Sequence, residues 1–304
     1  MPCGLRGTQG QQQPEDARVI AEEFGRTVAA EAARLGERGL ERRRDSRVFF
    51  ELLPRQTVDT VGTKTVWVRC SGADKRRVSV LLLGSSAGRK KPPFLVFEEP
   101  PSKVPWRQKE NESTRHGFGP CVWDSLKHTC LRDTTFANKA GWLTGPLIVR
   151  WLEQMFRDDP GPKLLLLDEF SGHWTNEVLK KCEELQITLL KIPAGCTSVS
   201  QPADMCWNKP FKPHIRKLWV DRLMETVKAN QPIVPPHRGT VCSWVKMAWD
   251  RLEAVENGFR ASHIIIDTDA QVEELSRVLG LVEIGSDIQV GLSGEESDNI
   301  TEDE

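Results

Sequence analysis

Two aspartates in this chain lie where a divalent metal ion could be bound. The apolar run Leu164–Leu167 ends directly in Asp168, and leucines bounded by Pro162 and Ser171-Gly172 are typical of a fully buried strand. A carboxylate at the carboxyl end of such a strand lies at the edge of a sheet where α/β proteins place their chemistry. Asp204 follows after one expected helix and one expected strand, a crossover that can return the chain to the same edge. The two carboxylates would offer the oxygen ligands that Mg²⁺ prefers, and paired Mg²⁺ ions catalyse phosphodiester cleavage.

Other roles remain open for the residues near this strand end. A strand-end aspartate is more often a helix N-cap than a metal ligand. The side chain of Glu169 should point away from that of Asp168, because successive side chains of an extended chain alternate. His173 could support the site, or it could be a hydrogen-bonded histidine in a turn between strand and helix. The spacing of these residues does not decide between the interpretations.

The segments around the two aspartates predict a mixed α/β sheet. Closely spaced strand patterns separated by polar turns come first, which favours an antiparallel meander, and alternating helices and strands follow. Strands are expected at 48–53, 63–69, 77–83, 93–97, 164–167 and 187–192. Helices are expected after Thr144, around 178–185, from Ile215 to about Lys228 and from Val241 to about Val255, and residues 105–140 are expected to be rich in loops.

Changes in composition predict four segments. Residues 1–45 begin with a Gly/Gln-rich stretch that should be disordered and continue, through Arg44, as an amphipathic helical arm that packs against the rest of the protein. This arm is too short for a complete helix-turn-helix unit. The other segments are a main domain with its C-terminal helices at 46–265, a C-terminal extension at 266–290, and an acidic tail at 291–304 that should be disordered.

The overall charge, 42 basic against 43 acidic residues, gives no reason to expect nucleic-acid binding. Its distribution is more informative, because the acidic tail leaves the remainder of the chain mildly basic. Basic clusters recur along the sequence, and each is more often a solvated turn than a phosphate contact. The candidates for weak DNA contacts are Lys75, Arg76, Arg77, Lys209 and Lys212.

The eight cysteines include no Cys-x-x-Cys pair, which argues against a zinc site of the usual spacing. The start of the chain shows no apolar signal segment, so we expect a reducing compartment and free thiols. No apolar stretch approaches the roughly 20 residues that a membrane span needs. A soluble intracellular protein is therefore expected.

Several motifs follow one another in an order that is typical of one family. They are Thr57–Arg69, Lys75–Leu82, Lys91–Phe97, Arg115-His-Gly-Phe-Gly119, Gly141-Trp142, Leu164–His173, Gln201-Pro-Ala-Asp204 with Pro210-Phe-Lys212, and Trp244–Phe259. Over about residues 48–265, the chain resembles the DDE superfamily endonuclease domain of pogo/Tigger-type transposases, to which jerky and centromere protein B are related.

The resemblance implies an RNase H-like fold, with a five-stranded mixed sheet, flanking helices, a helical C-terminal extension and three acids near the centre of the sheet. Asp168 matches the second acid and Asp204 the third, and His173 and Gln201 would support them. A metal-dependent DNA endonuclease with Mg²⁺ or Mn²⁺ as cofactor is the implied ancestral activity. DNA and a second copy of the chain are the implied partners, and the nucleus is the implied compartment, with neither a membrane nor a small-molecule substrate.

The resemblance fails at the first acid. The family's aspartate falls four residues before the residue that matches Val48, where this sequence has Arg44, and Asp45 is displaced by one position. A slip of one residue turns a strand side chain to the opposite face, although a bulge could restore it, so Asp45 is a doubtful third catalytic acid. An arginine between two acids would also neutralise the charge that should bind metal. Upstream of residue 45 we find neither the resemblance nor the family's helix-turn-helix region.

We expect a transposase-derived domain that binds DNA and whose ancestral cleavage activity has degenerated. Asp168 and Asp204 favour an active metal-dependent nuclease. The missing first acid and the basic clusters favour a catalytically inactive, domesticated protein whose DNA binding weakens steeply with salt. The unmatched amino-terminal sequence favours a non-functional transposon remnant, which would show a broad, non-cooperative thermal transition.

Overall fold

In a computed structural model of the protein, the described residues are 14–35, 40–51, 72–73, 75–159, 161–193, 207, 209–253, 255 and 259. All of them belong to the first of two compact units, Met1–Ile265, and the second unit is Ile266–Glu304. Four expectations lie outside the described residues: the disordered start at 1–13, the strand at 63–69, Gln201 with Asp204, and the segments after residue 265.

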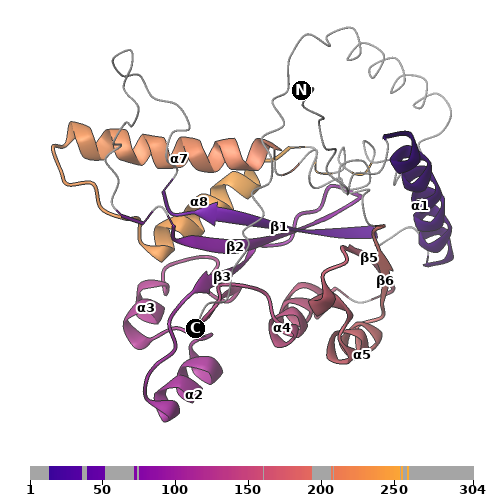
Figure 1. Ribbon diagram of the computed structural model, residues 1–304, viewed down its shortest axis with the longest axis horizontal. Coiled ribbons are helices and arrows are strands. Elements are labelled where there is room, and N and C mark those ends of the chain that lie inside the picture. Colours follow the sequence, from indigo (N-terminus) through magenta and orange to yellow (C-terminus); the bar gives the residue numbers. More distant parts are fainter. Residues whose placement is uncertain are drawn as a thin grey trace, which may run out of the picture. The chain divides into compact units, whose positions relative to one another are not determined.

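A six-stranded sheet in the order β4-β3-β2-β1-β5-β6 forms the centre of the fold (Figure 1). β1 is antiparallel to β2, and β2 to β3, whereas the pairs β1 and β5, β5 and β6, and β3 and β4 are parallel. The strands are β1 Leu40–Phe49, β2 Arg77–Ser85, β3 Phe94–Glu98, β4 Thr135–Asn138, β5 Lys163–Leu167 and β6 Ile187–Lys191. An antiparallel meander is thus joined to a parallel pair of strands, and the predicted RNase H-like mixed α/β class is confirmed.

The sheet has one strand more than the five that the resemblance implies. The additional strand is β4, which lies in the stretch that the sequence predicts to be rich in loops. That prediction is wrong, because the helices α2 (Pro105–Thr114) and α3 (Pro120–Ser125) occupy the same stretch. With four residues, β4 is too short to show a periodic pattern.

A turn at His116-Gly117 contacts the outer edge of β4. The backbone oxygen of His116 accepts a hydrogen bond from the Ala137 N–H at 2.8 Å, and His116 Nδ1 lies 3.0 Å from the Thr135 oxygen. Gly117 has a φ of +91°, and a Cβ at this position would lie 2.1 Å from the Ala137 oxygen. Glycine is required here for its backbone conformation and for the close approach. The turn therefore supplies part of the pairing that an edge strand otherwise lacks.

Helices cover both faces of the sheet (Figure 1). One face packs against α1 (Pro14–Leu35), α7 (Lys209–Lys228) and α8 (Arg238–Asp250), and the other against α4 (Gly145–Phe156) and α5 (Asn176–Glu184). Leu82 and Leu166 face the first core, and Leu81 and Leu165 face the second. Because both faces are covered, β2 and β5 are buried along nearly their whole length, which is why their sequences do not alternate.

β1 starts earlier than the sequence predicts. The helical pattern of residues 14–44, with its expected break near Gly36 or Gly39, ends at Leu35, and the strand predicted from Val48 begins at Leu40. The intervening charged residues have a good intrinsic propensity for helix. Pairing with β2 on one side and β5 on the other overrides this local preference. The predicted strands β2, β3, β5 and β6 and helices α4, α5, α7 and α8 are confirmed, with α7 beginning earlier than expected.

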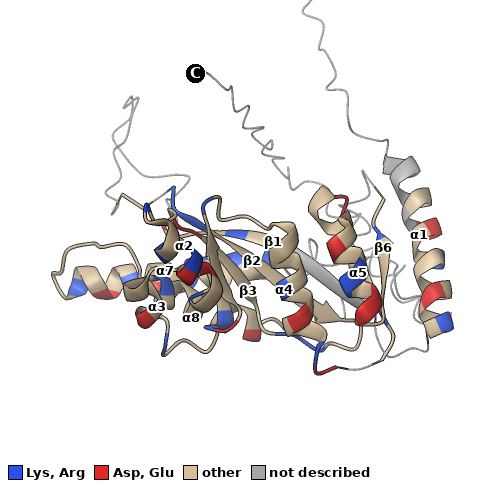
Figure 2. Cartoon of the chain, turned by 90° about the horizontal axis from the view of Figure 1, so that it is seen from below, with Lys and Arg blue, Asp and Glu red and all other residues tan. Residues whose placement is uncertain are grey.

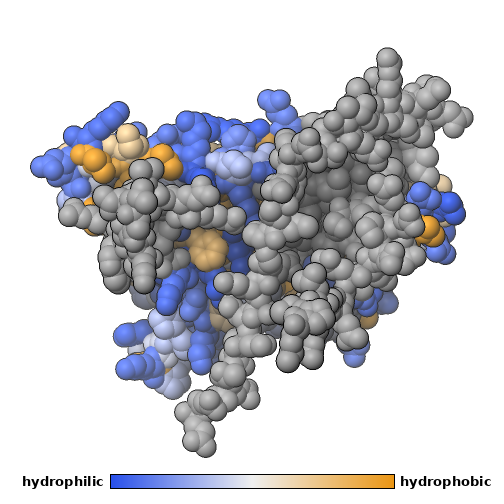
Figure 3. Space-filling view, turned by 45° about the horizontal axis from the view of Figure 1, so that its top comes forward, coloured by the Kyte–Doolittle hydropathy of each residue, from blue (hydrophilic) through white to orange (hydrophobic). Residues whose placement is uncertain are grey.

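Apolar side chains gather on the outer part of α7 (Figure 3). Val220, Met224 and Val227 are exposed and recur at a spacing that places them on one face of the helix. The buried residues of α7, Phe211 and Ile215, lie in its first half. The helix is therefore anchored at its beginning, and its second half presents an apolar face.

None of the helices in the described part of the chain combines the length and the apolarity that crossing a membrane requires.

Lys90 fastens α8 to the connection between β2 and β3. Its ammonium group donates hydrogen bonds to the backbone oxygens of Trp249, Asp250 and Leu252 at 2.8 to 3.0 Å. Trp249 and Asp250 are the last two residues of α8 and Leu252 follows it, so Lys90 binds the carboxyl end of the helix, where a positive charge is favourable. In return, the indole N–H of Trp249 donates to the Lys91 oxygen at 2.9 Å. Burial lowers the pKa of Lys90, while the nearby Asp250 carboxylate acts in the opposite direction.

Lys90→Met should lower the free energy of unfolding by about 2 kcal/mol, because it removes hydrogen bonds from a charged donor to carbonyl groups at a helix end. Urea denaturation at neutral pH measures the change. Lys103→Met, which removes an exposed lysine, is the control and should alter the stability by less than about 0.5 kcal/mol. Equal effects of the two substitutions would contradict the role given to Lys90.

Candidate functional site

Asp168 follows the carboxyl end of β5, the strand between β1 and β6. All residues of β5 are buried, and the strand is parallel to both of its neighbours. The side chain of Asp168 is itself 42% exposed. A carboxylate that is held at the end of a buried parallel strand and reaches solvent occupies the position where α/β sheets carry out chemistry.

The local turn orients the Asp168 carboxylate. Its Oδ1 accepts a hydrogen bond from the Phe170 N–H at 3.2 Å and lies 3.0 Å from His173 Nδ1. The backbone oxygen of Asp168 accepts a hydrogen bond from the indole N–H of Trp174 at 3.2 Å. The bond to the N–H two residues on makes this an Asx turn. The alternative role as a helix N-cap is wrong, because Phe170 holds that position before the short helix η1 (Ser171–Trp174).

His173 is the buried partner of Asp168. Its side chain is only 2% exposed, and its ring packs edge-on against Phe170 with centroids 5.1 Å apart. The Nε2 atom is buried and has no hydrogen-bond partner among the residues described. The contact between Nδ1 and the carboxylate fixes the direction of the Asp168 side chain, which is what a supporting residue would do.

An aromatic contact that the sequence did not reveal links this turn to β1. The rings of Phe170 and Trp142 are 6.3 Å apart and nearly perpendicular, and the Arg47 guanidinium lies 4.7 Å from the centre of the Trp142 ring. The Gly141-Trp142 motif was the feature of the sequence that could have indicated this contact. Gly141 has a φ of +60°, and a Cβ there would lie 2.9 Å from the backbone nitrogen of Glu98. The glycine thus permits the close packing that positions Trp142.

The register of β1 bears directly on Asp45. The antiparallel pairing with β2 runs without a break from Glu41 to Phe49, so the bulge that could restore Asp45 does not occur in this pairing. Position 45 pairs with Leu81, and position 44 pairs with Leu82. These two leucines are buried in cores on opposite faces of the sheet.

The parallel pairing of β1 with β5 shows which of positions 44 and 45 lies beside Asp168. Arg42 is matched with Leu166. Two residues further along both strands, position 44 is level with Asp168. The extended pairing therefore places the backbone of Arg44, and not that of Asp45, beside Asp168.

The described residues do not fit a divalent metal ion. Within the described ranges, no three His, Cys, Asp or Glu side chains converge closely enough to bind one. Asp204 and Gln201 lie outside these ranges, which leaves Asp168 as the carboxylate at this edge, with an arginine at the neighbouring position. Mg²⁺ and Mn²⁺ sites are built from several oxygen ligands, so Asp168 alone does not make one.

The basic candidates fall in two places. Lys75, Arg76 and Arg77 lead into β2 and line a hollow that also contains Arg238 of α8, which the sequence did not suggest. Lys209 and Lys212 are exposed in the first turns of α7. Elsewhere, basic and acidic side chains are interspersed, as on α1 and α5 (Figure 2). The cluster before β2 is therefore the more concentrated of the two.

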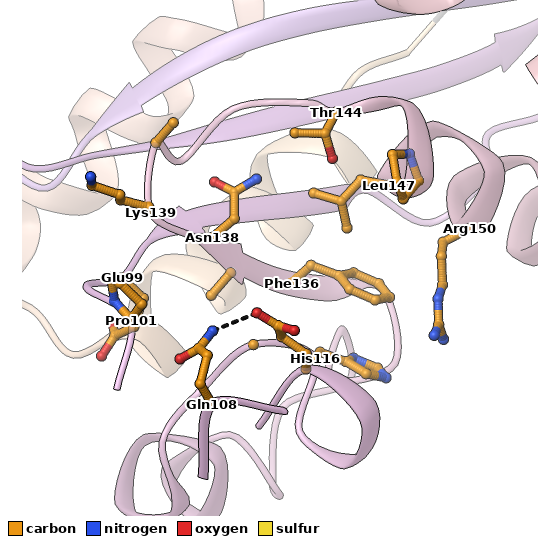
Figure 4. A pocket seen from close by; sticks show the side chains of 15 residues that line it. Glu99, Pro101, Gln108, His116, Phe136, Asn138, Lys139, Thr144, Leu147 and Arg150 are labelled. Atoms are coloured by element: carbon orange, nitrogen blue, oxygen red, sulfur yellow. Dashed lines mark hydrogen bonds between the residues drawn. The ribbon is translucent and has the colours of Figure 1, made fainter. Parts of the chain in front are cut away.

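A second candidate is a cavity of about 560 Å³ beside β4 (Figure 4). Gln108 and Glu112 of α2 border it, joined by a hydrogen bond of 2.6 Å, and Arg150 of α4 lies on the other side. His116 is stacked on Phe136 with ring centres 4.2 Å apart, and burial lowers the pKa of its imidazole. Both charge signs occur in the lining, so the cavity does not select one class of ligand.

Sequence comparison identifies the family to which the chain belongs. The profile of the family described as DDE superfamily endonuclease matches residues 75–259, and the chain belongs to this family. Among its relatives is "Pogo transposable element with KRAB domain" of Homo sapiens, 28% identical over 249 residues, a match that covers 78% of this chain and 36% of the relative. The Mus musculus protein of the same name is 26% identical over 246 residues, covering 77% and 36%. The chain thus spans little more than a third of the length of these curated relatives.

Solved structures of Mos1 complexes are also similar to this chain. The "Mos1 mariner paired end complex with Mn" has a TM-score of 0.46 and 11% sequence identity, and the match covers 86% of this chain and 63% of that chain. The "Mos1 Strand Transfer Complex" has a TM-score of 0.45 and 10% identity, with the same coverage.

Asp168→Ala should lower the free energy of unfolding by about 2 kcal/mol, because it removes the acceptor of the Phe170 N–H and the nearer of the two Asp168 oxygens that His173 Nδ1 contacts. Asp168→Asn should have a smaller effect, since its amide oxygen can still accept a hydrogen bond. Urea denaturation of the three proteins tests this order. The control is Glu169→Ala, which breaks a half-exposed ion pair with Lys191 and should change the stability by less than about 1 kcal/mol. An Asp168→Ala effect no larger than the control would refute the structural role.

Proposed function

We propose that this chain is a transposase-derived DDE domain that binds DNA and does not cleave it. The observation that carries the proposal is the unbroken register of β1 with β2, together with its parallel pairing with β5, which reaches Arg42 and Leu166. Extended by two residues, this pairing puts position 44, an arginine, level with Asp168. Family membership and the basic cluster before β2 support DNA as the ligand.

The arginine opposes metal binding for two physical reasons. A guanidinium group has no lone pair to offer a cation and keeps its positive charge at every relevant pH. In place of a carboxylate, it removes an oxygen ligand and puts a positive charge where a negative charge would attract the ion.

A metal-dependent endonuclease and strand-transfer enzyme is the second candidate. It is favoured by the exposed Asp168 carboxylate, which its turn and His173 hold in one direction. In that enzyme, Asp168 and Asp204 would bind Mg²⁺ or Mn²⁺, Gln201 and His173 would support them, and Asp45 would be the doubtful third acid. The metal would supply an activated water and stabilise the leaving oxygen.

The proposal extends to the organisation and location of the protein. The DDE domain, predicted at residues 46–265, contains the family match, and we extend it to residue 40 because β1 begins there. The arm is then residues 1–39, and residues 266–290 and 291–304 remain the predicted extension and tail. DNA as the ligand favours the nucleus, and a second copy of the chain stays a predicted partner.

The purified protein should bind duplex DNA with an affinity that falls steeply between about 50 and 200 mM salt, because phosphate contacts release counterions. It should not nick supercoiled plasmid in Mg²⁺ or Mn²⁺. Fluorescence anisotropy and a plasmid-nicking assay measure the two properties. Undetectable binding at low salt would refute the proposal, and nicking that Asp168→Asn abolishes would establish the second candidate instead. A broad, non-cooperative thermal transition would favour the remnant.

Arg44→Asp should make the protein responsive to Mn²⁺, because it replaces the opposing charge with a carboxylate level with Asp168. The expected result is a rise in the thermal transition of this variant with Mn²⁺ concentration, since a ligand that binds the folded state stabilises it. Wild-type protein should show no rise. Arg44→Ala is the matched control, because it removes the positive charge without adding a ligand. A wild-type response as large as that of Arg44→Asp would contradict the role given to the arginine.

A further inference from the structure

Arg76 and Arg238 separate two neighbouring hollows. Neither hollow is lined by Asp168 or by the residues of its turn. The first has a volume of about 590 Å³ and is bordered by α3 and by the Pro235-Pro236 segment before α8. The second has a volume of about 490 Å³ and is bordered by the start of β2 and the end of β3. Both arginines line both hollows.

Positive charge exceeds negative charge in the lining. The second hollow has four basic side chains against two carboxylates: Lys75, Arg76, Arg77 and Arg238 against Glu98 and Glu99. Arg238 forms an ion pair with Glu99. Burial lowers the pKa of Arg238, Glu99 raises it, and the charge of Arg76 lowers it again. The two guanidinium groups are thus near enough to repel each other, and an anion between them would relieve the repulsion.

Both guanidinium groups are held by their surroundings. The Arg76 group lies 4.6 Å from the centre of the Phe50 ring, so one of its faces is covered while the N–H groups around its edge can still donate. Arg238 is 18% exposed and is fixed by Glu99. Donors that are already held in place lose little conformational entropy when an anion binds.

The first hollow adds apolar surface beside these donors. Val234 is exposed, and the neighbouring Pro235 and Pro236 form a stiff segment. Apolar walls exclude water and so strengthen nearby charge interactions. A ligand that combines an anionic group with an apolar part, such as phosphate with deoxyribose, matches both kinds of surface.

We propose that Arg76 and Arg238 form a subsite for the phosphodiester backbone of duplex DNA. This inference rests on the proposed DNA binding and names the residues that would carry it. Planar guanidinium groups match phosphate oxygens in pairs. The backbone of Arg76 pairs with Phe50, six residues beyond position 44, which is level with Asp168 when the β1–β5 pairing is extended by two residues. Arg76 and Asp168 are therefore separated by roughly 20 Å along the strands. One duplex, with a phosphate charge about every 1.7 Å of its axis, could contact both.

The test compares Arg76→Ala and Arg76→Gln with wild-type protein as full-length chains. Binding to a labelled duplex of mixed sequence is measured by anisotropy across a salt series. Both variants should bind more weakly, and the slope of log affinity against log salt should decrease by about 1 for the lost phosphate contact. The affinity ratio between wild type and variant should therefore shrink about three-fold between 50 and 200 mM salt. Arg76→Gln keeps part of the aliphatic stem and a planar polar end group, and so guards against a loss of folding.

Arg157→Ala is the matched control, because Arg157 is an exposed arginine that follows α4 on the other side of the sheet. Its affinity and salt slope should equal those of wild type. If wild-type protein binds and both Arg76 variants behave like Arg157→Ala, the subsite is wrong and the proposed DNA binding stands. If wild-type protein itself does not bind, the proposed function fails, and the subsite fails with it. Thermal melts of all four proteins establish that each is folded.

Discussion

The parallel pairing of β1 with β5 is the interaction on which the rest of this structure depends. Its few residue pairs join the antiparallel strands β1, β2 and β3 to the parallel strands β5 and β6. Without them, the chain would have two small sheets, each with an exposed edge. The same pairing decides which residue of β1 stands beside Asp168, because a shift of one residue would exchange the faces of neighbouring positions. Fold and site chemistry are therefore determined by one register.

Sequence patterns identified the elements whose signals are local. β2, β5 and α4 are contiguous apolar or amphipathic segments, and Asp168 and His173 could be paired because a single turn contains both. The remaining features depend on contacts between distant segments. The charged half of β1 is extended because strands pair with it on both sides, and β4 depends on the turn at His116-Gly117. Trp142 beside Phe170, and Arg76 beside Arg238, likewise could not be recognised before the fold was known.

The Asp168 carboxylate has a structural role in its turn that does not depend on catalysis. Its Oδ1 accepts the hydrogen bond of the Phe170 N–H and contacts the buried His173. Removal of the carboxylate would take an acceptor away from both groups, and buried polar groups that lose partners are destabilising. The residue is thus retained by the requirements of folding as much as by those of catalysis. An arginine at position 44 has no such consequence for the turn, because it lies on another strand.

The hydrogen bonds between Lys90 and the end of α8 bear on how the protein folds during its synthesis. The three carbonyl groups that Lys90 binds lie about 160 positions later in the chain, and β1 pairs with a strand more than a hundred positions away. During synthesis, the meander therefore leaves the ribosome long before either partner exists. Contacts of such long range slow folding and leave apolar strands uncovered in the meantime. For this chain, the native sheet can close only after β5 and β6 have been synthesised.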